Sequence, residues 1–282
     1  MKLRTLALVL LVSLPMLKLG AAEPGHFRSG EVRLVTTHVI AVRRDEDVDP
    51  ANARTMVYLS DVPLDANKIA AAFSGSQEAE SELPEGAAGY VRVCIDGDGS
   101  ECGLYFSHNQ PSGSFNSSGS GDFKLTVNDG KRIAGRWTQA TPKEFFGETY
   151  DYDLPFDAAV VVPPGTPLPA DGGEPAQAYR RWLAALVKGE VVTLRVLAAE
   201  DADNAWQLRS DDANEVKSAL KDLRDGTPVS ATILRGRSDG DSAVLWVKGA
   251  DRDEIQRQGR VLMRREGGVW KFAEASLEDA DE

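Results

Sequence analysis

Residues 162–173 read VPPGTPLPADGG, and this stretch divides the chain into two parts with different hydrophobic patterns. Four prolines within residues 163–169 favour an extended, semi-rigid spacer. Asp171-Gly172-Gly173 completes the boundary. The stretch therefore predicts a linker over residues 163–173 between two domains. Two domains also suit the 282 residues of this chain, because that length is large for a single hydrophobic core.

The part before the linker, residues 31–162, is rich in predicted strands separated by Gly, Asn, Asp and Ser clusters. The expected strands are residues 32–42, 55–59, 89–95, 104–107, 122–127, 132–138 and 148–162. One short helix around Ile69 and Phe73 interrupts them and stops at Gly75. Short strands with turns between them predict a mainly antiparallel β-sandwich or open barrel. Residues 23–30 are expected to be a loose leader.

The part after the linker begins with helices and ends with strands. An apolar face at helical spacing predicts a first helix that ends at Lys188-Gly189. That face comprises Tyr179, Trp182, Leu183, Leu186 and Val187. Further helices are expected over residues 191–199 and 210–226, then strands over residues 229–235, 242–249, 259–265 and 268–273. This order predicts an α+β domain over residues 174–276, followed by an acidic, solvated tail over residues 277–282.

Two resemblances accompany these patterns. Three helices, strands joined by Ser238-Asp239-Gly240-Asp241 and the ending Gly268-Val269-Trp270-Lys271 resemble the nuclear transport factor 2-like superfamily. That resemblance covers residues 174–276 and implies a cone of three helices and a curved antiparallel sheet. The superfamily includes enzymes and dimerisation modules, so the fold alone does not select a function. Arg132-Ile133-Ala134-Gly135-Arg136 and Glu144–Tyr150 resemble a domain of uncharacterised exported bacterial proteins.

The first 22 residues have the pattern of a signal peptide. A basic start is followed by an apolar stretch over residues 6–17, which is too short to span a bilayer. Gly20-Ala21-Ala22 offers the small residues of a cleavage site after Ala22. An uncleaved anchor is the alternative, but Pro15 and Lys18 interrupt the stretch. We expect an exported protein, periplasmic or extracellular, from a Gram-negative bacterium, with no transmembrane segment after the signal.

Cys94 and Cys102 lie in VRVCIDGDGSECGLYF, residues 91–106. Two strand-like runs flank a Gly- and Asp-rich turn, so a hairpin brings the two thiols within reach of a disulfide. No histidine lies nearby and the spacing is not C-x-x-C, which disfavours a zinc or redox pair. The acidic residues from Asp96 to Glu101 also suggest a calcium loop, but the full twelve-residue pattern is absent.

Composition and the absence of known motifs disfavour several classes of function. The net charge of −12 opposes binding to nucleic acid or anionic membranes. No phosphate-binding loop, dinucleotide fingerprint, HExxH motif or nucleophile elbow is present, and His26, His38 and His108 do not have metal-ligand spacing. No cofactor or metal is therefore expected. Residues 107–120, SHNQPSGSFNSSGS, are expected to form a mobile surface loop.

Residues 242–248 carry apolar side chains at both parities, so both faces of that strand are apolar. One face is expected to pack on the helices. The other is expected to form a patch for self-association into a homodimer or for docking the first domain. The residues assigned to this patch are Val244, Trp246, Val261, Met263 and Val269.

The sequence thus favours a non-enzymatic binding or interaction protein of the periplasm or cell envelope, with a small molecule or a protein as its partner. An envelope assembly or dimerisation module is the first alternative. The second is an isomerase or hydrolase that uses a buried carboxylate in the cone, because the second domain contains no histidine.

Overall fold

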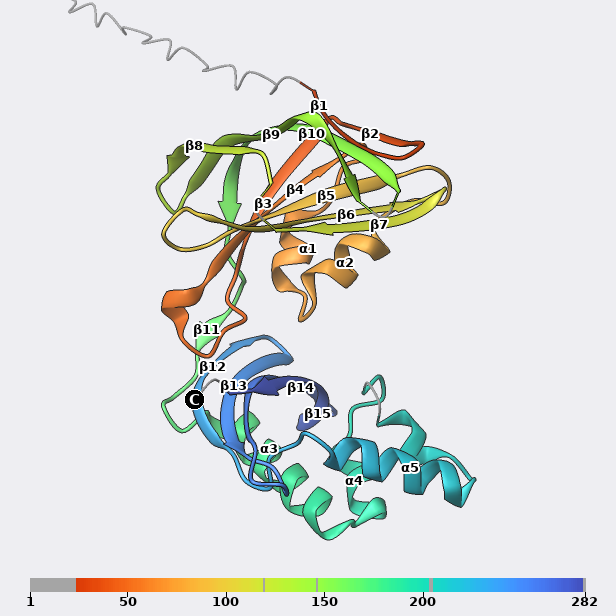
Figure 1. Cartoon of the computed structure of the whole chain (residues 1–282). Coiled ribbons are helices and arrows are strands. Elements are labelled where there is room, and N and C mark those ends of the chain that lie inside the picture. Colours follow the sequence, from red (N-terminus) through yellow and green to blue (C-terminus); the bar gives the residue numbers. More distant parts are fainter. Residues whose placement is uncertain (1–23, 119, 146, 203–204, 281–282) are drawn as a thin grey trace, which may run out of the picture.

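The computed structural model describes residues 24–118, 120–145, 147–202 and 205–280, and it is a mixed α+β structure (Figure 1). The expected signal peptide lies outside the described residues. Within the described residues, strands form two separate sheets, one of ten strands and one of five. None of the described helices combines the length and the apolar character that crossing a membrane requires.

The larger sheet is built from the first half of the chain. Its strands are β1 (Gly25–Ser29), β2 (Val32–Thr36), β3 (His38–Arg44), β4 (Arg54–Ser60), β5 (Gly89–Ile95), β6 (Glu101–Asn109), β7 (Ser112–Ser117), β8 (Asp122–Asn128), β9 (Arg132–Phe145) and β10 (Glu148–Val161). Their order is β2-β1-β10-β3-β4-β5-β6-β7, with β9 also paired to β10 and β8 paired to β9. All pairs are antiparallel except β10 with β3.

Alternate side chains along the strands of the larger sheet belong to two different apolar cores, one on each face of the sheet. Val57 and Leu59 of β4 lie in a core shared with Phe27 and Trp137, between the two curled halves of the sheet. The intervening Tyr58 belongs to a second core on the opposite face. That second core is covered by α1 (Ala66–Ala71) and α2 (Gly75–Ser81), which lie against the β3–β7 half of the sheet (Figure 1). A strand buried on both faces accounts for the nearly continuous apolar run of β4.

The smaller sheet comes from the second half of the chain and is antiparallel throughout. It contains β11 (Thr166–Pro167), β12 (Thr232–Asp239), β13 (Ser242–Ala250), β14 (Gln256–Glu266) and β15 (Val269–Asp279) in chain order. Its helices are α3 (Gly173–Lys188), α4 (Val191–Leu197) and α5 (Ala213–Arg224). The short 3-10 helices are η1 (Pro50–Asn52) and η2 (Trp206–Arg209). The expected apolar face of α3 is largely buried, and the helix ends at Gly189 with a φ of 76°, a left-handed conformation that suits glycine.

The two sheets meet through the segment that follows β3. Arg235 of β12 donates hydrogen bonds to both carboxylate oxygens of Asp45, at 2.6 Å each, and to the Asp47 carbonyl oxygen. Phe73, from the connection between α1 and α2, belongs to the apolar core of the smaller sheet. Packing and ion pairing therefore connect the two halves of the chain directly, besides the connection along the backbone.

Four expectations about the chain's course are wrong. Residues 25–29 of the expected leader form β1, and Phe27 is completely buried there. Residues 112–117 of the expected loop form β7, which pairs with β6 and buries Phe115. In the expected acidic tail, β15 continues to Asp279. Gly75, the expected helix stop, begins α2. In the first three cases a partner strand supplies the backbone hydrogen bonds that local propensity does not reveal.

Candidate functional site

The disulfide prediction is confirmed. Cys94 and Cys102 are bonded, with their Cα atoms 5.0 Å apart, where β5 turns into β6. The turn between them is closed by the Asp96 amide, which donates to the Ser100 carbonyl oxygen, and Gly99 has a φ of 91°. The Asp98 carboxylate accepts hydrogen bonds from the amide and the hydroxyl of Ser100. The acidic residues of this segment thus serve the hairpin turn.

The three histidines have ordinary local partners. His26 Nε2 lies 3.1 Å from a carboxylate oxygen of Asp151, and His108 Nδ1 lies 3.1 Å from the Pro111 carbonyl oxygen. The exposed His38 contacts the Thr37 hydroxyl. Across the described ranges, no three His, Cys, Asp or Glu side chains are grouped so as to hold a metal ion.

The five residues assigned to an association patch do not form an exposed surface. Val244, Trp246, Val261 and Met263 are at most 9% exposed and lie in the core of the smaller sheet, whereas Val269 is 51% exposed. The guanidinium of Arg235 covers the indole of Trp246, 3.6 Å from the ring centroid. Among the described residues, the most exposed large apolar side chains are instead Val192 and Val196 of α4. Self-association stays a prediction, and these four core residues are not available for it.

A cavity of about 330 Å³ lies between α3, the end of α5 and β15. This volume is at the lower end of the range of about 300–1,000 Å³ that small-molecule pockets occupy. Its apolar wall includes the rings of Trp182 and Phe272, which stack in parallel with centroids 4.4 Å apart. Leu223 and Leu277 also line it. The cavity therefore offers a flat aromatic surface and aliphatic flanks to an apolar molecule.

The Tyr179 side chain also lines this cavity, and its hydroxyl is buried without a hydrogen-bond partner in the described part of the chain. Burial raises the pKa of Tyr179, so the hydroxyl keeps its proton and is available as a donor. An unpaired buried hydroxyl costs about 1–3 kcal/mol of stability. A bound molecule that accepts this hydrogen bond offsets that cost.

The rim of the cavity is acidic. Asp222 and Asp225, at the end of α5, are exposed, and Asp225 forms an ion pair with Lys221 at 2.6 Å. Glu274 of β15 is half-buried. None of these three carboxylates is fully buried. The rim charge disfavours an anionic ligand at this site.

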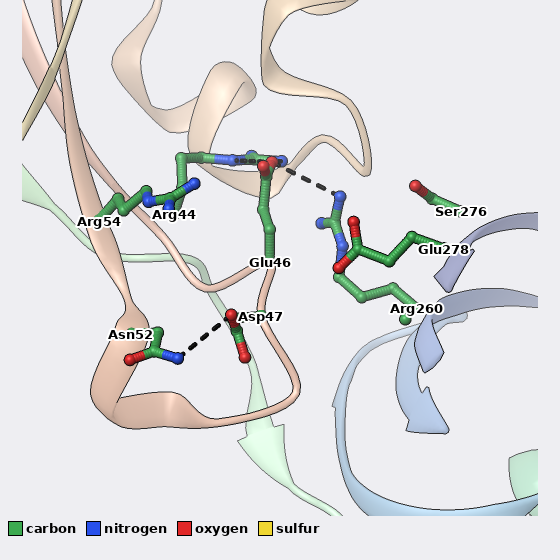
Figure 2. Close-up of a pocket in the computed structure, with 9 residues that line it drawn as sticks. Arg44, Glu46, Asp47, Asn52, Arg54, Arg260, Ser276 and Glu278 are labelled. Carbon is green, nitrogen blue, oxygen red and sulfur yellow. Dashed lines mark hydrogen bonds and ion pairs between the residues drawn. The ribbon is translucent and has the colours of Figure 1, made fainter. Parts of the chain in front are cut away.

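A second hollow region, the inter-sheet cleft, lies where the segment after β3 approaches β14 and β15. Figure 2 shows one part of it, with Glu46 between Arg44 and Arg260. The Glu46 carboxylate accepts hydrogen bonds from Arg44 Nε at 2.9 Å and Nη2 at 2.8 Å, and Arg260 Nη2 lies 3.5 Å away. Partial burial by itself raises the pKa of Glu46, but the two arginine charges outweigh this effect and hold the pKa below its ordinary value.

Sequence reasoning found neither Tyr179 nor the arginines of the cleft as functional candidates. The sequence correctly places Tyr179 on the apolar face of the first helix. Whether its hydroxyl has a hydrogen-bond partner depends on the side chains that other elements pack around it. Arg44, Arg92 and Arg260 are far apart in the sequence and carry no spacing motif.

Comparisons of the chain with protein-family models, curated proteins and solved structures find no match.

Proposed function

We propose that this chain is an exported, non-enzymatic binding protein, and that it holds a small, mainly apolar molecule in the cavity between α3, α5 and β15. The observation that carries this proposal is the buried, unpartnered hydroxyl of Tyr179 at the wall of that cavity. The stacked rings of Trp182 and Phe272 provide the apolar contact. The ligand is uncharged or cationic and carries a hydrogen-bond acceptor, because the donor is a neutral hydroxyl and the rim is acidic.

The proposal includes the domain layout expected from the sequence, with a β-rich domain over residues 31–162 and a nuclear transport factor 2-like cone over residues 174–276. The order of elements supports it, since α3, α4 and α5 precede the antiparallel strands β12–β15. A cavity between the helices and the sheet is the feature that such a cone supplies. Export is supported by the disulfide, because disulfides persist in oxidising compartments.

Titration with an uncharged, environment-sensitive fluorophore that carries a ketone acceptor, such as prodan, tests the proposed function. We expect saturable binding to the purified full chain, and a dissociation constant about fivefold higher for Tyr179→Phe, which removes one neutral hydrogen bond. Tyr152→Phe is the matched control, because the Tyr152 hydroxyl donates to the Ser120 carbonyl oxygen within the other core. Equal prodan affinity in the wild type and Tyr179→Phe, or no saturable binding, contradicts the proposal.

A further inference from the structure

The inter-sheet cleft contains a second cavity that differs in chemistry from the first. It has a volume of about 350 Å³ and lies between three parts of the fold. Tyr58 and Arg92 contribute from the larger sheet and Arg260 from the smaller sheet. Residues 73–77, which comprise the end of the α1–α2 connection and the first turn of α2, supply the third part of the lining. Glu274 and Ala275 of β15 line both cavities, so β15 separates the two sites.

Arg44 lines the cavity but is fully engaged by the protein. Its Nε and Nη2 atoms donate to the Glu46 carboxylate, and Nη2 also donates to the Phe73 carbonyl oxygen at 2.8 Å. Its Nη1 atom donates to the carbonyl oxygens of Ile69 at 2.9 Å and Ala72 at 3.0 Å. A guanidinium has five N–H donors, and these contacts use all of them. Arg44 therefore secures α1 and Glu46 and has no donor left for a ligand.

Arg92 lines the cavity from the larger sheet. It lies in β5 directly between Tyr58 of β4 and Tyr105 of β6 in the strand register, and its guanidinium is 5.2 Å from the Tyr105 ring centroid. Its guanidinium also interacts with the Tyr58 side chain, and its charge contributes to holding the pKa of Glu46 below its ordinary value. Packing against Tyr58 and Tyr105, with cation–π attraction to the Tyr105 ring, fixes the position of the Arg92 side chain on the surface of the sheet. The Arg92 side chain therefore presents a positive charge to the cavity.

Arg260 supplies a second guanidinium from the smaller sheet. It stacks over the Phe73 ring at 4.6 Å, donates Nη1 to the Phe73 carbonyl oxygen at 3.1 Å and places Nη2 3.5 Å from a carboxylate oxygen of Glu46. Burial lowers the pKa of Arg260, which reflects the cost of placing its charge in the cleft. The cavity is lined by three arginines and two glutamates, an excess of positive charge in a protein whose net charge is −12.

We propose that this cavity binds a small oxyanion, a carboxylate or a phosphate, held between Arg92 of the larger sheet and Arg260 of the smaller sheet. Planar guanidinium groups bind carboxylate and phosphate oxygens through paired, charge-assisted hydrogen bonds. Ser74 and Ser76 also line the cavity, and their hydroxyl oxygens lie 3.5 Å apart, so that one hydroxyl can donate to the other and the second to a ligand. Because the two arginines belong to different sheets, a bound anion also stabilises the arrangement of one sheet on the other.

Isothermal titration of the full chain with inorganic phosphate and, separately, with succinate tests this site. We expect saturable binding of at least one of them, and a dissociation constant at least tenfold higher for Arg92→Gln. Arg264→Gln is the matched control, since Arg264 is exposed on β14 and does not line this cavity. This variant loses the same charge and is expected to keep the wild-type affinity.

The comparison of the two anions identifies the source of the oxyanion. Binding of phosphate alone supports a phosphate group, and binding of succinate with equal affinity supports a general carboxylate or phosphate site.

Absence of saturable binding of both anions, or equal weakening by Arg92→Gln and Arg264→Gln, overturns the proposal. If Arg92→Gln does not fold, Arg92→Lys keeps the charge and loses the paired geometry, so an unchanged affinity in that variant overturns it too. Tyr179→Phe leaves anion binding unchanged, which separates this site from the proposed apolar cavity.

Discussion

Arg235 and Asp45 lie 190 positions apart in the sequence and form a two-point ion pair across the junction of the two sheets, with both N–O distances at 2.6 Å. The same guanidinium stacks on Trp246 and donates to the carbonyl oxygens of Asp47 and Val48. Both side chains are about three-quarters buried, with exposed fractions of 24% for Arg235 and 22% for Asp45. This one side chain joins the segment after β3 to β12 and covers the apolar ring beneath it.

Arg235→Ala is therefore expected to lower stability by about 2–4 kcal/mol, because it leaves a largely buried carboxylate and two carbonyl oxygens without their donor. Urea unfolding followed by tryptophan fluorescence measures the change. Arg264→Ala removes an exposed arginine from the same sheet and is expected to alter stability by less than about 0.5 kcal/mol. Equal effects of the two substitutions mean that the junction is not held by this ion pair.

Tyr179→Phe is expected to leave the unliganded protein as stable as the wild type, or about 1 kcal/mol more stable. The substitution removes a hydroxyl that is buried without a partner and leaves the packing of the ring in place. Tyr152→Phe is expected to lose about 1 kcal/mol, because the Tyr152 hydroxyl donates to the Ser120 carbonyl oxygen. Chemical denaturation of both variants tests the contrast. A larger loss of stability in Tyr179→Phe than in Tyr152→Phe shows that the Tyr179 hydroxyl has a stabilising partner.

Reduction of the Cys94–Cys102 disulfide is expected to cost about 2–3 kcal/mol, since the sequence separation of 8 closes a short loop. Unfolding by urea with and without a reductant measures this loss. The double variant Cys94→Ser with Cys102→Ser is the control, and the reductant is expected to have no effect on it. A reductant effect on the double variant of the same size as in the wild type means that the loss does not come from this bond.

The environment of Glu46 predicts a loss of stability in acid. Its pKa is lower in the folded protein than the ordinary value of 4.5, so the charged carboxylate stabilises the fold above that value. This contribution declines as the pH falls below about 4.5 and disappears once the pH is below the lowered pKa of the folded state. The difference in unfolding free energy between the wild type and Glu46→Gln, measured from about pH 7 to about pH 3, is expected to shrink toward acid pH. A constant difference across this range contradicts the prediction.

Phe27→Ala tests whether residues 23–30, which the sequence predicts to be a loose leader, contribute to the core. The ring of Phe27 is completely buried and stacks on Phe106 with centroids 4.5 Å apart. Its removal is expected to cost about 3–5 kcal/mol, the range for deleting a core aromatic ring. Thermal or chemical unfolding gives the value. A cost below about 1 kcal/mol, as at a solvated position, means that β1 is not part of the core.

Local patterns predicted those parts of the fold whose signals lie within a few residues. The expected strand over residues 89–95 coincides with β5, and the apolar spacing of Tyr179, Trp182 and Leu186 gives the buried face of α3. Cys94 and Cys102 pair because the turn between them is short and rich in Gly and Asp. The strand β7 was missed because its Gly, Ser and Asn residues have low strand propensity, and pairing with β6 overrides it.

The sequence alone thus determined the α+β character, the order of elements in the second half, the helix end at Gly189 and the disulfide, because each depends on hydrophobic periodicity or on residues close in the chain. Tertiary structure alone decided that Trp246 is covered by Arg235 instead of being exposed, that Tyr179 has an unpaired hydroxyl at a cavity wall, and that Arg92 and Arg260 face one cleft. These features depend on which side chains distant strands bring together. A hydrogen bond or an ion pair acts over a few ångströms in space, and sequence separation does not measure that distance.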